Sequence, residues 1–233
     1  MITEKREFKM TDFNEPLRNG PPGSGLEKIK RAFMAALALL AVLFFAAPGA
    51  RAADSGASGV IGRFNSALLE AMKKADELGY KGRYGILAPV IKDSFDMRFM
   101  ASQSAGRYWA AFTGPQQNRL VDTFTDWTIA TYANRFDGYS GEKFRVESET
   151  AFRDGMVAVI SKLIKADNGE VVFHYILRKS GDAWRIIDIR ISGVSQLALT
   201  RAQFSDVLKS KGLDGLIADL RAKIREYAGE PRK

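Results

Sequence analysis

The sequence predicts an α+β domain: an antiparallel four-stranded meander sheet packed against N- and C-terminal helices around an apolar pocket. Three observations indicate this class. Apolar residues recur at helical spacing between positions 59 and 136, residues 144–191 alternate with a period of two, and helical spacing returns after position 200. Helices before and after a run of strands are typical of α+β domains, and no repeat at a fixed period indicates a solenoid.

The composition fits a globular chain and excludes several kinds of chemistry. The 233 residues are 46% hydrophobic and 27% charged, with a formal net charge of +8. This positive balance suits acidic partners or anionic membrane surfaces, without identifying either. The absence of cysteine excludes disulfides, thiolate catalysis and Cys-ligated metals. His174 is the one histidine and stands in an apolar strand, which argues against a His-rich metal site or a Ser-His-Asp triad.

The N-terminal part predicts export. Residues 1–25 are polar and contain several Pro and Gly, so we expect disorder. Three basic residues between 28 and 31 then precede the apolar run Ala32–Ala47 and small residues up to Ala52, the order of a secretory signal peptide. An uncleaved membrane anchor is the alternative, but the run is shorter than the roughly 20 residues that span a bilayer. We expect cleavage after Ala52 and one folded domain over residues 53–233.

Helices are predicted from apolar periodicity and its breaks. The first runs from Gly59 to a stop at Gly79, followed by a loop over residues 80–88. Pro89 is placed at the first position of a short helix, where its missing N–H costs nothing. A longer helix begins at Gly114-Pro115 and ends at Asp137-Gly138. The last apolar helical face includes Leu213, Leu216, Ile217, Leu220, Ile224 and Tyr227.

Four strands follow the long helix and are joined by tight turns. Turn residues such as Asp154-Gly155, Asn168-Gly169 and Ser180-Gly181-Asp182 connect them, which predicts successive antiparallel pairing. Thr200 is predicted to be the N-cap of the following helix. The predicted strands are Phe144–Thr150, Met156–Lys165, Glu170–Lys179 and Ala183–Ile191.

Aromatic and methionine side chains are the candidate ligand-binding residues. A curved sheet against helices leaves a concavity that an apolar ligand can enter. Most of these side chains have a simpler interpretation as core, yet as a set they exceed the needs of a small core. Stacking on nucleic acid is set aside because an exported protein seldom meets it. The candidates are Phe95, Phe99, Met100, Tyr108, Trp109, Phe112, Phe124, Trp127, Phe173, Tyr175, Leu177, Trp184 and Ile186.

No motif identifies an enzyme. Phosphate-binding glycine motifs are absent from the sequence. Asp93 and Asp96 are best explained as polar residues at helix ends or in loops. Asp188 is expected on the strand face of Ile186, where it either faces a pocket or pairs with an arginine such as Arg201, and we favour the pair. The sequence therefore predicts no catalytic residue, no metal and no cofactor.

Several segments, through their order and spacing along the chain, carry a resemblance to a known family. They are Gly106-Arg-Tyr-Trp109, Gly114-Pro-Gln-Gln117, Tyr132-Ala133, Tyr139-Ser-Gly-Glu142, Phe144, Tyr175-Ile-Leu177, Trp184-Arg-Ile-Ile-Asp-Ile189, Gly193-Val-Ser195, Arg201-Ala-Gln-Phe204, Gly212 and Leu216-Ile217. With this pattern the chain resembles the MlaC family of periplasmic lipid carriers, also described as toluene-tolerance proteins, which serve MCE-type ABC transport systems. Ser94-Phe-Asp96 and Trp127 look most like the hopanoid-associated HpnM branch.

The resemblance implies an NTF2-like fold with a deep apolar pocket for a phospholipid or a hopanoid. It also implies a shuttle between membranes, with two partners: an inner-membrane MCE-domain protein with its ABC transporter, and an outer-membrane lipoprotein complex. Thr200 departs from the family, which often has an aromatic there. Two other functions stay open: a small-molecule enzyme of the same fold, and a noncatalytic envelope assembly factor. Basic residues predicted near the pocket rim either steer the carrier to anionic headgroups or are solvated surface charge, namely Arg98, Arg107, Lys143 and Arg145.

Overall fold

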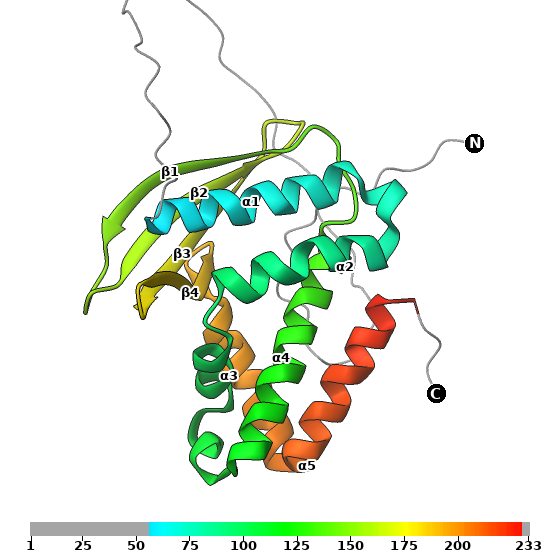
Figure 1. The fold of residues 1–233 in the computed structure, drawn as a ribbon, viewed down its shortest axis with the longest axis vertical. Helices are drawn as coiled ribbons and strands as arrows, with labels where there is room; N and C mark the ends of the chain where they lie inside the picture. Colours follow the sequence, from blue (N-terminus) through cyan, green and yellow to red (C-terminus); the bar gives the residue numbers. More distant parts are fainter. Residues whose placement is uncertain (1–55, 230–233) are drawn as a thin grey trace, which may run out of the picture.

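A computed structural model describes residues 56–229 of the chain. These residues form α-helices, a 3-10 helix and an antiparallel sheet, which confirms the α+β class. Helix α1 lies along one face of the sheet, and the remaining helices extend away from it as a second layer (Figure 1). The helices are α1 (Ala57–Lys73), α2 (Ala75–Ser94), α3 (Met97–Ala105), the 3-10 helix η2 (Gly106–Ala111), α4 (Gly114–Arg135) and α5 (Gln196–Tyr227).

The sheet has the predicted meander order, with a short fifth strand at its edge. Each neighbouring pair is antiparallel. Gly155 and Gly181 adopt φ of 71° and 62° in the first and third turns, a conformation that glycine adopts without strain. The strands are β1 (Lys143–Ala151), β2 (Val157–Ile164), β3 (Glu170–Ser180), β4 (Ala183–Ile191) and β5 (Val194–Ser195).

A β-bulge in β4 changes which side chains face the core. The register between β3 and β4 shifts by one residue, so Ile187 stands unpaired between Ile186 and Asp188. Because an extra residue reverses the alternation beyond it, Ile189 shares the inner face of Ile186. The prediction that Asp188 lies on that face is therefore wrong.

Helix α2 occupies a segment that we predicted to be a loop. Residues 80–88 are helical, and Pro89 lies inside the helix instead of opening one. The predicted first helix is also divided, because α1 already ends at Lys73. Gly79 has φ 56° and ψ −172°, a conformation essentially restricted to glycine, so the chain bends there and the helix resumes. Burial of aliphatic side chains after the bend outweighs the local loop signals.

Helix α5 begins five residues earlier than predicted, because its N-cap is residue 195 and not residue 200. Ser195 is its N-cap, since its hydroxyl accepts a hydrogen bond of 3.0 Å from the backbone N–H of Ala198. The Thr200 hydroxyl instead donates to the Gln196 carbonyl at 2.8 Å, as a residue inside a helix does. The correction places residues 196–199 on the helix that packs against α4.

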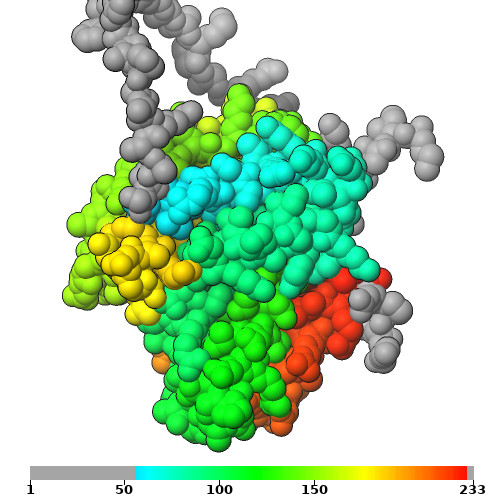
Figure 2. Space-filling view, in the orientation of Figure 1, coloured from blue at the N-terminus to red at the C-terminus, as the bar shows by residue number. Residues whose placement is uncertain are grey.

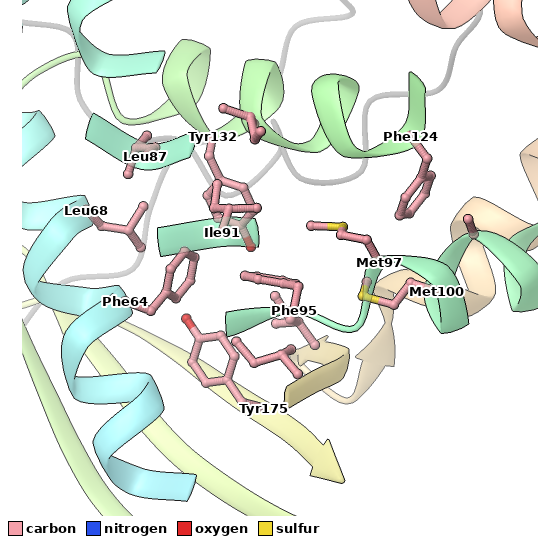
Figure 3. Close-up of a cluster of buried hydrophobic side chains, with 14 of the residues drawn as sticks. Phe64, Leu68, Leu87, Ile91, Phe95, Met97, Met100, Phe124, Tyr132 and Tyr175 are labelled. Atoms are coloured by element: carbon pink, nitrogen blue, oxygen red, sulfur yellow. The ribbon is translucent and has the colours of Figure 1, made fainter. Parts of the chain in front are cut away.

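The core lies between α1, the inner face of the sheet and the following helices. Phe64 of α1 is at its centre, and its ring meets the rings of Phe95, Tyr132 and Tyr175 edge-on (Figure 3). The centroid distances are 5.2, 5.3 and 6.1 Å, within the range of favourable aromatic pairs. Met100 continues this apolar region beyond Phe95 (Figure 3). The core therefore reaches the helices that form the pocket described next.

Candidate ligand-binding site

A pocket lies between α4 and the first turns of α5, with contributions from the α2–α3 junction, α3 and β4. Its empty volume is about 740 Å³, part of which is open to solvent. Ligand sites are typically concave and lined mainly by apolar side chains with a few polar groups, and the lining of this pocket has that character. Its apolar lining consists of Phe95, Met100, Phe124, Trp127, Ile189, Leu197 and Leu199.

Polar side chains complete the lining, but their threonine hydroxyls are already bonded. Each of these hydroxyls donates at 2.8 Å to the backbone carbonyl four residues earlier in its own helix: Thr128 to Phe124, Thr131 to Trp127 and Thr200 to Gln196. A hydroxyl bonded in this way needs no partner from a ligand, so the wall tolerates an apolar molecule. The polar lining consists of Thr128, Thr131, Tyr132, Arg135, Gln196, Thr200 and Gln203.

Trp127, a residue of the pocket lining, carries a buried hydrogen-bond donor. Its ring packs against Phe124 and Phe204, with centroids 5.7 and 6.1 Å away. Its Nε1 is buried and has no hydrogen-bond partner among the described residues. An indole N–H can only donate, and a buried donor without an acceptor costs roughly 1–3 kcal/mol. A ligand oxygen that reached this nitrogen would remove that cost.

Tyr132 keeps its part of the wall uncharged. Burial raises the pKa of its phenol above the ordinary value, an effect that Arg135 partly offsets. The ring stacks on Phe136, with centroids 5.8 Å apart and planes inclined by 17°. Arg135, at the last turn of α4, is the charged residue of the lining. The site is thus an apolar pocket with one cationic side chain.

The structure brings four of the predicted site residues together. Phe95, Met100, Phe124 and Trp127 all line the pocket. Four others are buried at 2% exposure or less on the inner face of β3 and β4, where they form core: Phe173, Tyr175, Leu177 and Ile186. The remaining five are partly buried outside the lining: Phe99, Tyr108, Trp109 and Phe112 around α3 and η2, and Trp184 on β4.

The residues of α5 that line the pocket were not predicted from the sequence. Gln196, Leu197 and Leu199 were placed before the helix because the predicted N-cap lay at Thr200. A cap at Ser195 would have put them on the first turn, so the Ser195 side chain was the signal to follow. Thr200 itself lines the pocket, at the position where the family often has an aromatic.

Asp188 holds α5 onto the sheet. Its Oδ1 accepts hydrogen bonds from the Ser195 hydroxyl at 2.9 Å and from the Leu197 N–H at 3.2 Å. Its Oδ2 lies 3.6 Å from Nε of Arg190. The predicted pairing with an arginine is confirmed, but the partner is Arg190 and not Arg201. Both carboxylate oxygens are engaged, so Asp188 positions the α5 wall of the pocket.

The other two candidate carboxylates have structural roles. Asp96 is the N-cap of α3, where it accepts the Phe99 N–H at 3.0 Å, and Arg178 donates to it at 2.8 Å. Asp93 is exposed and lies 3.9 Å from Arg185. The interpretation of these residues as polar groups at helix ends is confirmed for Asp96.

Three further observations bear on the predictions. Within residues 56–229, no group of three or more His, Cys, Asp or Glu side chains is arranged to hold a metal ion. Over the same range, no helix has the length and apolar character needed to cross a membrane. The predicted disorder of residues 1–25 and the signal peptide with cleavage after Ala52 lie outside the described residues.

The sequence of the chain was compared with known families and proteins. The profile of the family described as MlaC protein matches residues 63–222. The chain belongs to the MlaC family. A relative in Haemophilus influenzae, the intermembrane phospholipid transport system binding protein MlaC, is 24% identical over 140 residues; the match covers 58% of this chain and 64% of that relative. The toluene tolerance protein ttg2D of Pseudomonas putida is 26% identical over 166 residues, or 70% and 73% of the two chains.

A solved structure shares the fold. It is that of the phospholipid-binding protein from Ralstonia solanacearum in complex with a phospholipid, with a TM-score of 0.64 and 22% identity. The similarity covers 74% of this chain and 98% of that one. The two proteins therefore share their fold over about three quarters of this chain.

Proposed function

We propose that this chain binds a lipid in the pocket between α4 and α5 and carries it through the periplasm between the inner and outer membranes. The observation that carries the proposal is an apolar pocket whose threonine hydroxyls are bonded within their own helices, in a chain of the MlaC family. Such a wall can take up hydrocarbon without leaving polar groups unpaired.

The proposed activity is binding and transfer, without catalysis. Among the described residues no carboxylate lines the pocket, and Asp188, just outside it, already binds Ser195, Leu197 and Arg190. An enzyme of this fold would need an acid or base in contact with its substrate. An open pocket also favours a carrier over an assembly factor, which would have a filled interior.

We favour a phospholipid over a hopanoid as the cargo. The relatives named for phospholipid transport and phospholipid binding share this family or fold. The buried N–H of Trp127 also suits the carbonyl or phosphate oxygens of a phospholipid, whereas the fused hydrocarbon rings of a hopanoid offer it no acceptor. Arg135 adds a cation that a phosphate can approach.

Release requires a partner. Each buried CH₂ contributes about 0.8 kcal/mol, so one long acyl chain binds tightly and leaves slowly on its own. We propose that the inner-membrane MCE-domain protein with its ABC transporter and the outer-membrane lipoprotein complex, the partners that the family resemblance implies, open the pocket when they dock.

Native mass spectrometry of the exported protein, purified without detergent, tests this function. We expect one bound lipid per chain, and extraction should identify it as a phospholipid. The delipidated protein should take up phospholipid from vesicles. A hopanoid in its place would overturn the cargo assignment while keeping the carrier. A protein free of lipid that also takes none from vesicles would overturn the carrier itself.

A further inference from the structure

Three arginines and two aromatic residues gather at the end of the molecule formed by α3, η2 and α5. We call this group, Arg98, Arg107, Tyr108, Trp109 and Arg201, the η2 face. In Figure 1 and in the space-filling view, α3 and the green segment that follows it form the end of the molecule away from β1 (Figure 2). None of these residues lines the pocket.

Two of the arginines lie over aromatic rings and bind uncharged groups. The guanidinium of Arg98 is 5.6 Å from the ring centre of Trp109, and it donates to the side-chain oxygens of Asn118 at 2.9 Å and Gln117 at 3.1 Å. The guanidinium of Arg107 is 5.1 Å from the ring centre of Tyr108 and donates to the Tyr108 hydroxyl at 3.1 Å. These contacts orient the cations without neutralising them.

Arg201 joins the group across the start of η2. Gly106 has φ 55°, and a Cβ there would lie 3.1 Å from Nε of Arg201. The arginine of α5 therefore lies directly over the backbone that leads into Arg107. A side chain at position 106 would have to displace the guanidinium by a few tenths of an ångström, and the positive φ independently favours glycine there.

The positive charge of the η2 face is not balanced by carboxylates. Among the described residues, none of its three arginines lies within 4.0 Å of an Asp or Glu oxygen, whereas nearby Arg119 is paired with Asp214. Tyr108 and Trp109 are only partly buried beside them. Arginines without a carboxylate within 4.0 Å, beside partly exposed aromatic rings, suit a flat, anionic, amphipathic partner.

We propose that the η2 face docks the protein onto an anionic membrane surface, with the arginines on lipid phosphates and the two rings at headgroup depth. Arginine binds phosphate through paired N–H groups, and Trp and Tyr favour the membrane–water interface. The same helices supply walls of the pocket, Met100 from α3 and Thr200 from α5. Docking by this face would place the pocket beside the bilayer. The inference rests on the proposed function for its purpose, but its test is separate.

Vesicle flotation of the exported protein tests the docking surface. The vesicles contain phosphatidylcholine alone or phosphatidylcholine mixed with phosphatidylglycerol. We expect attachment to the phosphatidylglycerol vesicles only, weakened by salt. Each arginine near an anionic surface strengthens attachment about fivefold. The triple variant Arg98→Gln, Arg107→Gln and Arg201→Gln should therefore lose on the order of a hundredfold in affinity.

The matched control removes three exposed cations elsewhere: Lys81→Gln on α2, Lys143→Gln on β1 and Arg153→Gln in the β1–β2 turn. It should attach nearly as the parent does. Equal losses in both variants would show that net charge acts without a defined face and would overturn the proposal. Attachment of the triple variant at parental strength would also overturn it. A parent protein that binds neither kind of vesicle would overturn it as well, and would indicate an acidic protein partner instead.

Two measurements keep the result independent of folding and of cargo. The thermal midpoint should be the same within a few degrees for the parent, the triple variant and the control. Arg107→Gln alone, at an exposed site, should already show a loss of about fivefold in affinity. Native mass spectrometry should find the same bound lipid in all of them. Absence of lipid from the parent would count against the proposed function, while its attachment to vesicles would still decide the docking surface.

Discussion

Trp127, a residue of the pocket lining, combines a large apolar ring with a buried N–H that has no acceptor among the described residues. We expect a diacyl phospholipid, with ester carbonyls, to bind about fivefold more tightly than its diether analogue, because one added hydrogen bond contributes about 1 kcal/mol. Trp127→Phe keeps an aromatic ring but loses the N–H, so the preference should disappear. Competition between equal amounts of the two lipids, measured by native mass spectrometry, gives the ratio directly.

Trp109→Phe is the matched control, because Trp109 is an indole outside the pocket lining. It should keep the preference for the ester lipid. A fivefold preference that survives Trp127→Phe would show that another group binds the ester oxygens. A parent protein without any preference would show that the N–H stays unpaired in the complex.

Tyr132 and Tyr175 make folding stability sensitive to alkaline pH. Burial is the main cause that raises both phenol pKa values above the ordinary value of about 10. Above pH 10 the unfolded chain loses these protons while the folded protein keeps them. The free energy of unfolding therefore falls as the pH rises. The stabilisation is complete below about pH 10 and falls by roughly 1.4 kcal/mol per pH unit for each such tyrosine as pH rises further.

Tyr132→Phe should reduce this dependence. The quantity to compare is the difference in unfolding free energy between parent and variant, because contributions that the two proteins share cancel in it. That difference should shift in favour of the variant by roughly 1.4 kcal/mol per pH unit above pH 10, as urea denaturation would measure. A constant difference from pH 9 to pH 11 would contradict a raised pKa for Tyr132.

At the scale of elements, the path of α2 depends on Gly79. Its φ of 56° and ψ of −172° suit glycine alone, and a Cβ there would meet no other atom. Gly79→Ala should therefore destabilise the fold by about 1–3 kcal/mol through backbone strain and not through a clash. Gly85, in the same helix, also has open space around it but has ordinary helical geometry. Gly85→Ala should stabilise the fold by about 0.4–1 kcal/mol.

Urea denaturation of the two variants distinguishes backbone strain from a general intolerance of alanine in α2. The informative result is that the two substitutions change the free energy of unfolding in opposite directions. If Gly79→Ala were neutral, the chain would accept a different bend between α1 and α2, and the glycine would not be needed to position Leu87 and Ile91 in the core.

The elements that could be predicted from sequence are those with local signals. The turns around Gly155 and Gly181 and the alternation of β3 identified the meander, because tight turns leave strands only one way to pair. The bulge at Ile187 and the helical path through Pro89 could not be predicted. Both depend on burial against distant elements, which local pattern does not encode.

The site was predicted in part for the same reason. Phe124 and Trp127 are recognisable as large apolar residues on a long helix, and both line the pocket. Phe173 and Tyr175 look alike in sequence but face α1 and are filled core. The sequence shows which side chains are apolar. It does not show which of them surround the pocket, because that depends on the distance between α4 and α5.

For the whole molecule, the position of the pocket between α4 and α5 means that a bound lipid should raise the stability of the folded state. The pocket lies between α4 and α5, and Asp188 fixes the start of α5 to β4. A ligand that bridges α4, α5 and Ile189 adds contacts that only the folded chain can make. At a lipid concentration 100 times its dissociation constant, the folded state gains about 2.7 kcal/mol. For a domain of this size, that gain raises the thermal midpoint by roughly 5–10 °C.

Thr200→Phe should test whether this gain in stability comes from lipid bound in the α4–α5 pocket. The larger ring would occupy pocket space from the α5 wall, so we expect at least a tenfold loss of phospholipid binding and a thermal midpoint that no longer responds to lipid. Thr200→Val, which keeps the shape but removes the hydroxyl that donates to Gln196, should bind and respond as the parent does. Calorimetry with and without lipid measures both effects. If Thr200→Phe still gained several degrees from lipid, the cargo would lie outside the α4–α5 pocket, and the carrier would have to use another cavity of the same fold.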